Sequence, residues 1–118
     1  MAGHPKDSVE TDLAEYAATL VQIQAVMREK GMGGWIGTIG RWLVELEQPD
    51  LSSDQFCAHI QRSRARAGDM ILLAHVAFPN TDQHDRLQAR VKSLLAETER
   101  IAIVLGCAEP SRRRRVAP

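Results

Sequence analysis

Apolar residues recur along most of the chain at steps of three and four positions, which is the spacing of one face of an α-helix. Alternation of apolar and polar residues, the pattern typical of a strand, is absent from the sequence. The clearest stripe in the first half consists of Leu13, Tyr16, Leu20, Ile23 and Met27. The corresponding stripe near the end consists of Leu87, Val91, Leu94, Thr98, Ile101 and Leu105. These two stripes predict the first and last helices of an all-α fold.

Glycine, proline and capping residues divide the chain into about five predicted helices, which cover residues 8–30, 34–47, 53–66, 69–78 and 81–105. Gly31 and Gly68 are read as helix ends, and Ser52 with Gln55 as a capping box that opens the third helix. The sequence therefore predicts a single-domain antiparallel bundle over residues 1–107, followed by a disordered arginine-rich tail over residues 108–118.

The segment 69–78, "DMILLAHVAF", is apolar on nearly all sides. This pattern predicts the most buried helix of the bundle, and a buried strand is the alternative. His75 lies within this segment and is expected to be a core histidine with a hydrogen-bond partner.

The 118 residues correspond to one domain of ordinary soluble composition. No apolar run is long enough to cross a bilayer, and the first ten residues lack the apolar core of a secretory signal. We therefore expect a cytoplasmic protein without a membrane partner. Cys57 and Cys107 are too few for a disulfide framework, so free thiols are expected.

Basic and acidic residues balance at fifteen each, but the two halves differ. Residues 1–58 hold four Lys/Arg and nine Asp/Glu, whereas residues 59–118 hold eleven and six. Four of those eleven form the run Arg112, Arg113, Arg114 and Arg115 in the predicted tail. Such a run adds weak nonspecific affinity for nucleic acid through counterion release, or contacts an acidic partner. An unstructured solubilising end is the other interpretation.

The stretch "GMGGWIGTIGRW", residues 31–42, concentrates glycine and tryptophan. Ile36 stands where a dinucleotide-binding loop needs its third glycine, so no cofactor site is predicted. Gly37 and Gly40 fall inside a helix, where each costs about 1 kcal/mol relative to alanine. Close approach of another backbone is the expected compensation, with Trp35 and Trp42 beside that contact or beside a groove for a partner. The candidate partner-binding residues are Trp35, Gly37, Gly40, Trp42, Arg62 and Arg66.

The titratable residues form no recognised catalytic or metal signature. His59, His75 and His84 have no spacing typical of a metal site, even with Cys57 included. Cys57 and His59 are two positions apart and so lie on different faces of a helix, which excludes a local nucleophile–base pair. Glu45 and Glu47 diverge for the same reason. We therefore expect neither catalysis nor a cofactor or metal.

The stretches "GMGGWIGTIGRWLVEL" and "AGDMILLAHVAF" give the chain a resemblance to a family of small uncharacterised bacterial helical proteins. The second element of that family typically reads G-G-M-G-S-L-N-D-L-V-L, and the serine and asparagine of this pattern are absent here. The resemblance covers about half the chain. It implies an interaction or immunity-type module and assigns no catalytic residue.

The expected function is therefore that of a small helical protein-binding module of the immunity, antitoxin-like or inhibitor type. The alternative is a nucleic-acid-associated accessory protein that uses Arg112–Arg115 together with Arg62 and Arg66. A small enzyme whose residues are brought together only by the fold is the third hypothesis. The identity of the protein partner and self-association as a homo-oligomer are left open by the sequence.

Overall fold

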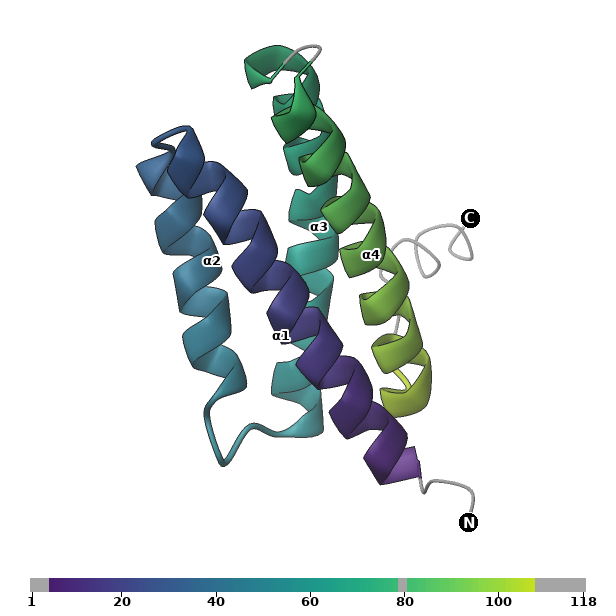
Figure 1. Cartoon of the computed structure of the whole chain (residues 1–118). Helices are drawn as coiled ribbons and strands as arrows, with labels where there is room; N and C mark the ends of the chain where they lie inside the picture. Colours follow the sequence, from purple (N-terminus) through teal and green to yellow (C-terminus); the bar gives the residue numbers. More distant parts are fainter. Residues whose placement is uncertain (1–4, 79–80, 108–118) are drawn as a thin grey trace, which may run out of the picture.

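The computed structural model describes residues 5–78 and 81–107, with the backbone alone for residues 5–9. Every element in these ranges is a helix: α1 (Pro5–Glu29), α2 (Gly33–Leu46), α3 (Ser53–Ala77) and α4 (Asp82–Leu105). Consecutive helices run in opposite directions, so the chain forms an antiparallel bundle (Figure 1). The all-α prediction is confirmed for this part of the chain. The predicted tail, residues 108–118, lies outside it.

The predicted apolar stripes form the core of the bundle. α1 and α4 pack against each other along their length, α2 packs on α1, and α3 packs on α4. The stripe side chains of α1 and α4 that are fully buried are Tyr16, Leu20, Ile23, Met27, Leu87, Val91, Leu94, Thr98 and Ile101. Burying a large apolar side chain contributes about 1.5–3 kcal/mol, which explains why these two stripes determine how the helices associate.

The helix ends follow the capping residues at three of the predicted positions. Gly31 and Gly106 adopt a left-handed backbone with φ of 72°, which ends α1 and α4 as expected. Ser52 and Gln55 form the complete capping box at the start of α3. Thr81 caps α4 by accepting a hydrogen bond from the amide of His84, so α4 begins at Asp82.

The prediction of two separate helices over residues 53–66 and 69–78 is wrong, because α3 is continuous from Ser53 to Ala77. Gly68 lies inside α3, and a side-chain carbon added there would meet nothing within 4 Å. A glycine inside a helix costs only about 1 kcal/mol relative to alanine. Burial of Ala67 and Met70 on either side of it outweighs that cost.

The second half of α3 is also not the most buried element of the bundle. Met70, Ala74 and Phe78 reach the core, but Leu72 and Val76 expose 63% and 71% of their surface. This segment is therefore apolar on nearly all sides, although only one of its faces is buried. The alternative of a buried strand is wrong for the same segment.

A disulfide bond joins Cys57 in the first turns of α3 to Cys107 just after α4. The expectation of two free thiols is therefore wrong. The two residues are 50 positions apart in the sequence, and their Cα atoms lie 5.4 Å apart. The antiparallel packing of α3 and α4 brings the beginning of one beside the end of the other, which no count of cysteines reveals.

Charged side chains connect α1 to α4 at both ends of their contact. Arg86 on α4 pairs with Glu29 at the end of α1, and Arg100 pairs with Asp12 and Glu15 nearer its beginning. The hydrogen bonds from Arg86 lower the pKa of Glu29 to about 2. Ion pairs between exposed side chains contribute about 0–1 kcal/mol each, so these pairs add little to the packing of α1 on α4.

Candidate functional site between helices α2 and α3

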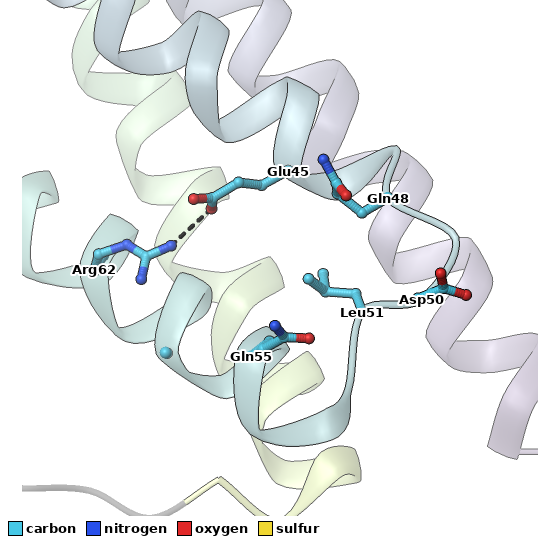
Figure 2. A pocket seen from close by; sticks show the side chains of 7 residues that line it. Glu45, Gln48, Asp50, Leu51, Gln55 and Arg62 are labelled. Atoms are coloured by element: carbon cyan, nitrogen blue, oxygen red, sulfur yellow. Dashed lines mark hydrogen bonds and ion pairs between the residues drawn. The ribbon is translucent and has the colours of Figure 1, made fainter.

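A groove of about 410 Å³ lies where the end of α2, the following loop and the first turns of α3 meet (Figure 2). Five of its seven lining residues are polar, and Glu45 and Arg62 face each other across one side. The residues that line it are Glu45, Gln48, Asp50, Leu51, Gln55, Ala58 and Arg62. We call this feature the α2–α3 groove.

Glu45 connects the α2–α3 groove to the interior of the bundle. One of its carboxylate oxygens, Oε1, accepts hydrogen bonds from His59 Nδ1 at 2.6 Å and from Arg62 Nη2 at 2.7 Å. The hydrogen bond from His59, aided by the charge of Arg62, lowers the pKa of Glu45. The carboxylate is therefore held ionised at neutral pH while 41% of the side chain remains exposed.

His59 is the histidine that the core contains. Its side chain is 1% exposed, and the edge of the Trp42 ring packs against it at a centroid distance of 6.4 Å. Since Nδ1 donates to Glu45, Nε2 of the neutral ring accepts a hydrogen bond from the Tyr16 hydroxyl at 2.9 Å. Burial lowers the pKa of His59 in spite of the nearby carboxylate, so the ring is neutral at pH 7.

The chain of contacts from Tyr16 through His59 to Glu45 resembles a proton relay in composition, but it ends inside the protein. Tyr16 is fully buried, and burial raises the pKa of its hydroxyl. No substrate reaches a hydroxyl at that position, and the exposed end of the chain is an ionised carboxylate already paired with Arg62. The arrangement is therefore suited to holding Glu45 in place at the groove.

Trp35 and Arg66 meet across the same side of the bundle, beside the groove. The guanidinium of Arg66 lies 4.6 Å from the centre of the Trp35 ring and also pairs with Asp69 at 2.9 Å. This cation–π contact joins the beginning of α2 to the middle of α3. The sequence analysis selected Trp35, Arg62 and Arg66 as candidates, and the structure places all three between α2 and α3.

One face of α3 next to the groove is uncovered along five turns of the helix. Its residues follow one another at steps of three and four, and each is exposed or half-buried. They are Ala58, Arg62, Ala65, Asp69, Leu72 and Val76. We call this face the α3 stripe. It begins at the groove, and its far end carries the two exposed aliphatic side chains, Leu72 and Val76.

The expected close approach of a backbone to Gly37 and Gly40 is not found. A side-chain carbon at Gly37 would lie 3.8 Å from the Arg41 guanidinium, and one at Gly40 would lie 3.5 Å from the Gln24 amide nitrogen. Both are ordinary van der Waals distances to flexible side chains. Gly40 faces Gln24 of α1, which donates a hydrogen bond to the carbonyl of Ile36, so this side of α2 does not contribute to the α2–α3 groove.

Trp42 was a candidate for contact with a partner, and the structure places it in the core with 6% exposure. It therefore supports the groove from below by packing on His59. Trp35, seven positions before it on α2, is half-buried. The sequence analysis placed Trp42 beside a close backbone contact or beside a groove for a partner, because spacing alone does not distinguish the buried from the exposed margin of a helix face.

His75, expected in the core, is exposed instead. Its ring packs edge-on against that of His84 at a centroid distance of 4.9 Å, and its Nε2 atom lies 3.4 Å from the Gln88 amide. Within residues 5–78 and 81–107, no group of three or more His, Cys, Asp or Glu side chains is arranged to hold a metal ion.

The three arginines of α3 point in two directions. Arg62 and Arg66 face α2, as their spacing of four predicts, and both hold carboxylates. Arg64 faces α4, where it donates to the carbonyl of Leu95 and to the Thr98 hydroxyl. The candidate residues Arg112–Arg115 lie outside the described residues.

Glu45 is the residue that the sequence analysis missed. It was considered only as a carboxylate beside Glu47 in the search for a catalytic pair. Its partners His59 and Arg62 lie on another helix, 14 and 17 positions further along the chain. The spacing of three between those partners, which places them on one face of α3, is the only signal that the sequence contains.

Comparisons of the chain with family models, with curated proteins and with solved structures find no match. None of the helices in the described ranges is both long enough and apolar enough to cross a membrane.

Proposed function

We propose that this protein is a small helical binding module, and that another protein docks on the α3 stripe and the adjoining α2–α3 groove. The observation that carries this proposal is the exposure of Leu72 and Val76, which lie one turn apart on the same face of α3. Exposed aliphatic side chains scattered singly are ordinary on a protein surface. Two of them continuing a face that leads into a polar groove are typical of an interface with an apolar centre and a polar rim.

The groove supplies the polar rim of this surface. Gln48 and Gln55 contribute amides, which both donate and accept, and Glu45 and Asp50 contribute carboxylates. Their positions are set by rigid elements, because Glu45 is anchored to the buried His59 and Gln55 belongs to the capping box of α3. Preorganised side chains lose less conformational freedom when a partner binds.

The alternative function, association with nucleic acid, would use Arg62, Arg66 and the run Arg112–Arg115. In the described part of the chain, Arg62 and Arg66 are each already paired with a carboxylate. These ion pairs neutralise much of the positive charge that would attract a phosphate, and this favours the protein-binding proposal over the alternative. Titration of labelled duplex DNA over a salt series separates the two, because affinity based on phosphate contacts falls steeply with salt.

The sequence led us to expect a cytoplasmic location, and this location is still a proposal. The disulfide Cys57–Cys107 favours a different compartment. Disulfide bonds persist mainly in oxidising surroundings and are rare in the cytosol. Rapid acid quenching of host cells, followed by thiol alkylation and mass spectrometry, measures the fraction of oxidised protein. A fully reduced pair supports the cytoplasmic location, and a fully oxidised pair contradicts it.

The test of the binding proposal uses a photoreactive residue at position 72 to capture the partner in host cells, followed by measurement of affinity with both proteins purified. We expect the double variant Leu72→Ser, Val76→Ser to lose at least about tenfold in affinity, the loss typical of a central contact. Both side chains are exposed, so the variant should fold normally.

The matched control is Val21→Ser, which removes an aliphatic side chain that is 50% exposed on the outer face of α1. The proposal requires that this control leave affinity unchanged. Equal losses in both variants, or none in the double variant, would show that the α3 stripe is not the docking surface. If sedimentation shows a dimer that the double variant dissociates, the docked partner is a second copy of this chain.

A further inference from the structure

The end of the bundle that contains the groove is acidic. The segment from Glu45 to Ala58 holds four carboxylates and no lysine or arginine. The carboxylates are those of Glu45, Glu47, Asp50 and Asp54, and all are exposed or half-buried. Arg62 is the cation in the groove wall, and its charge is balanced by its ion pair with Glu45. Glu45 and Asp50 line the groove, whereas Glu47 and Asp54 lie outside its lining on the same segment. A surface with this excess of negative charge attracts a basic segment.

The disulfide bond fixes the last described residue of the chain at this acidic end. Cys107 is bonded to Cys57, and the residue after Cys57 is Ala58, which lines the groove. The chain therefore continues past residue 107 from a point on α3 that is covalently held beside the groove. Since successive residues of a helix point about 100° apart, the side of α3 that holds Cys107 lies next to the side that faces the groove.

The basic run begins five residues after Cys107, at Arg112, and ends at Arg115. An extended chain covers up to about 3.3–3.6 Å per residue, so Arg112 can lie up to about 17 Å from Cys107. A helix with its side chains is about 10–12 Å across. The run is therefore long enough to pass part of the way around α3 and reach the groove.

We propose that the segment Arg112–Arg115 occupies the α2–α3 groove of its own chain, with the four guanidinium groups facing the carboxylates of residues 45–54. A short tether keeps the effective concentration of such a segment in the millimolar range, so weak pairwise attractions suffice for occupancy. This inference rests on the proposed function, because the tail then shields the groove from the docked protein. It follows that the partner displaces the tail with a basic segment of its own.

The test compares amide chemical shifts of the full-length protein with those of a variant in which all four arginines are replaced by glutamine. We expect shifts confined to residues 45–58 at about 0.02 M salt, and we expect about 0.5 M salt to move the wild-type spectrum toward that of the variant. A synthetic peptide, SRRRRVAP, added to the variant should reverse the shifts. Identical spectra, or differences located elsewhere on the bundle, would overturn the proposal.

Charge reversal supplies the matched control. The double variant Asp50→Lys, Asp54→Lys should abolish the difference between the arginine and glutamine tails, whereas Asp85→Lys should preserve it. Asp85 is an exposed carboxylate in the first turn of α4, at the opposite end of the bundle (Figure 1). If Asp85→Lys abolished the spectral difference between the two tails as fully as the groove variant, the attraction would be a general effect of charge. That result would contradict the inference.

The failure of this inference is distinguishable from the failure of the proposed function. If the tail leaves the spectrum unchanged while Leu72→Ser, Val76→Ser still weakens the partner, the module binds protein but has no tail in its groove. If the tail shifts residues 45–58 while the α3 stripe variant binds normally, the groove takes a basic segment and the stripe is not the docking surface. Support for both requires that the glutamine-tail variant bind the partner more tightly than the wild type.

Discussion

Removal of the disulfide bond should cost a large part of the stability of this protein. In the double variant Cys57→Ser, Cys107→Ser, the unfolded chain regains the freedom of a loop that spans 50 positions. The loop-closure relation gives an entropy of about 14 cal/mol/K for that span, or about 4 kcal/mol at 25 °C. A domain of this size is typically stable by about 5–15 kcal/mol, so the variant should remain folded but with a much lower urea midpoint.

The assay is urea unfolding of the oxidised wild type, the reduced wild type and the serine variant, followed by far-ultraviolet circular dichroism. Reduction should lower the free energy of unfolding of the wild type by about the same 4 kcal/mol and leave that of the variant unchanged. A pair of truncations isolates the cross-link from the tail. Deletion of residues 108–118 should change stability by less than about 1 kcal/mol, whereas deletion of residues 107–118 removes Cys107 and should cost as much as reduction.

Three results would refute this reasoning. The first is mass spectrometry showing two free thiols in protein purified without reductant. The second is a decrease of less than about 1 kcal/mol in the free energy of unfolding on reduction. That result would mean that the start of α3 and the end of α4 stay close together without the disulfide bond, in the unfolded chain or through other contacts. The third is an equal effect of the two truncations, which would assign the stability to the tail.

Four further substitutions test the packing described above. Gly37→Ala and Gly40→Ala should each stabilise the protein by up to about 1 kcal/mol in urea unfolding. The structure leaves room for a methyl group at both positions, and alanine favours a helix. A loss of stability in either variant would restore the close-contact hypothesis. Burial raises the pKa of Glu97 above 4.5, so the native state binds a proton that the unfolded state has released, and stability is lost as pH rises from about 4.5. Glu97→Gln should remove that loss, so the stability of the variant relative to the wild type should increase with pH in thermal melts. A relative stability that stays the same at every pH would contradict this expectation. Tyr16→Phe should cost about 1–3 kcal/mol at pH 7.5 because it leaves the buried Nε2 atom of His59 without a donor, and urea unfolding with no loss would show that the hydrogen bond contributes nothing.

The helices of the core could be predicted from the sequence because their signal is local. The apolar residues of α1 and α4 recur at steps of three and four, which form a single face only if the backbone is an α-helix. Every residue of these two stripes is buried except Leu13 and Leu105, which are half-buried. Gly68 shows the limit of this reasoning. A local cost of about 1 kcal/mol was read as a helix end, while the compensating burial of Ala67 and Met70 depends on α4, which lies further along the chain.

The candidate site was less accessible to prediction because it depends on contacts between helices. Trp35, Arg62 and Arg66 were selected as aromatic and basic residues on helix faces, and the structure brings them to one side of the bundle. Trp42 was selected on the same grounds and is buried. The pairing of Cys57 with Cys107 depends on the topology of the bundle, which places two positions that are 50 residues apart within 5.4 Å.

The two hydrogen bonds of Glu45 differ in strength, and the difference determines how a basic segment can use the groove. The bond to His59 satisfies a ring nitrogen in a side chain that is 1% exposed, so breaking it leaves a buried donor unpaired at a cost of about 1–3 kcal/mol. The bond to Arg62 joins two side chains that are 51% and 41% exposed, and such pairs contribute about 0–1 kcal/mol. If the proposed basic segment enters the groove, we expect its guanidinium to replace Arg62 on the carboxylate and to leave His59 in place. The buried histidine keeps Glu45 oriented while its cationic partner is exchanged, so the groove can release one basic group and accept another without disturbing the core.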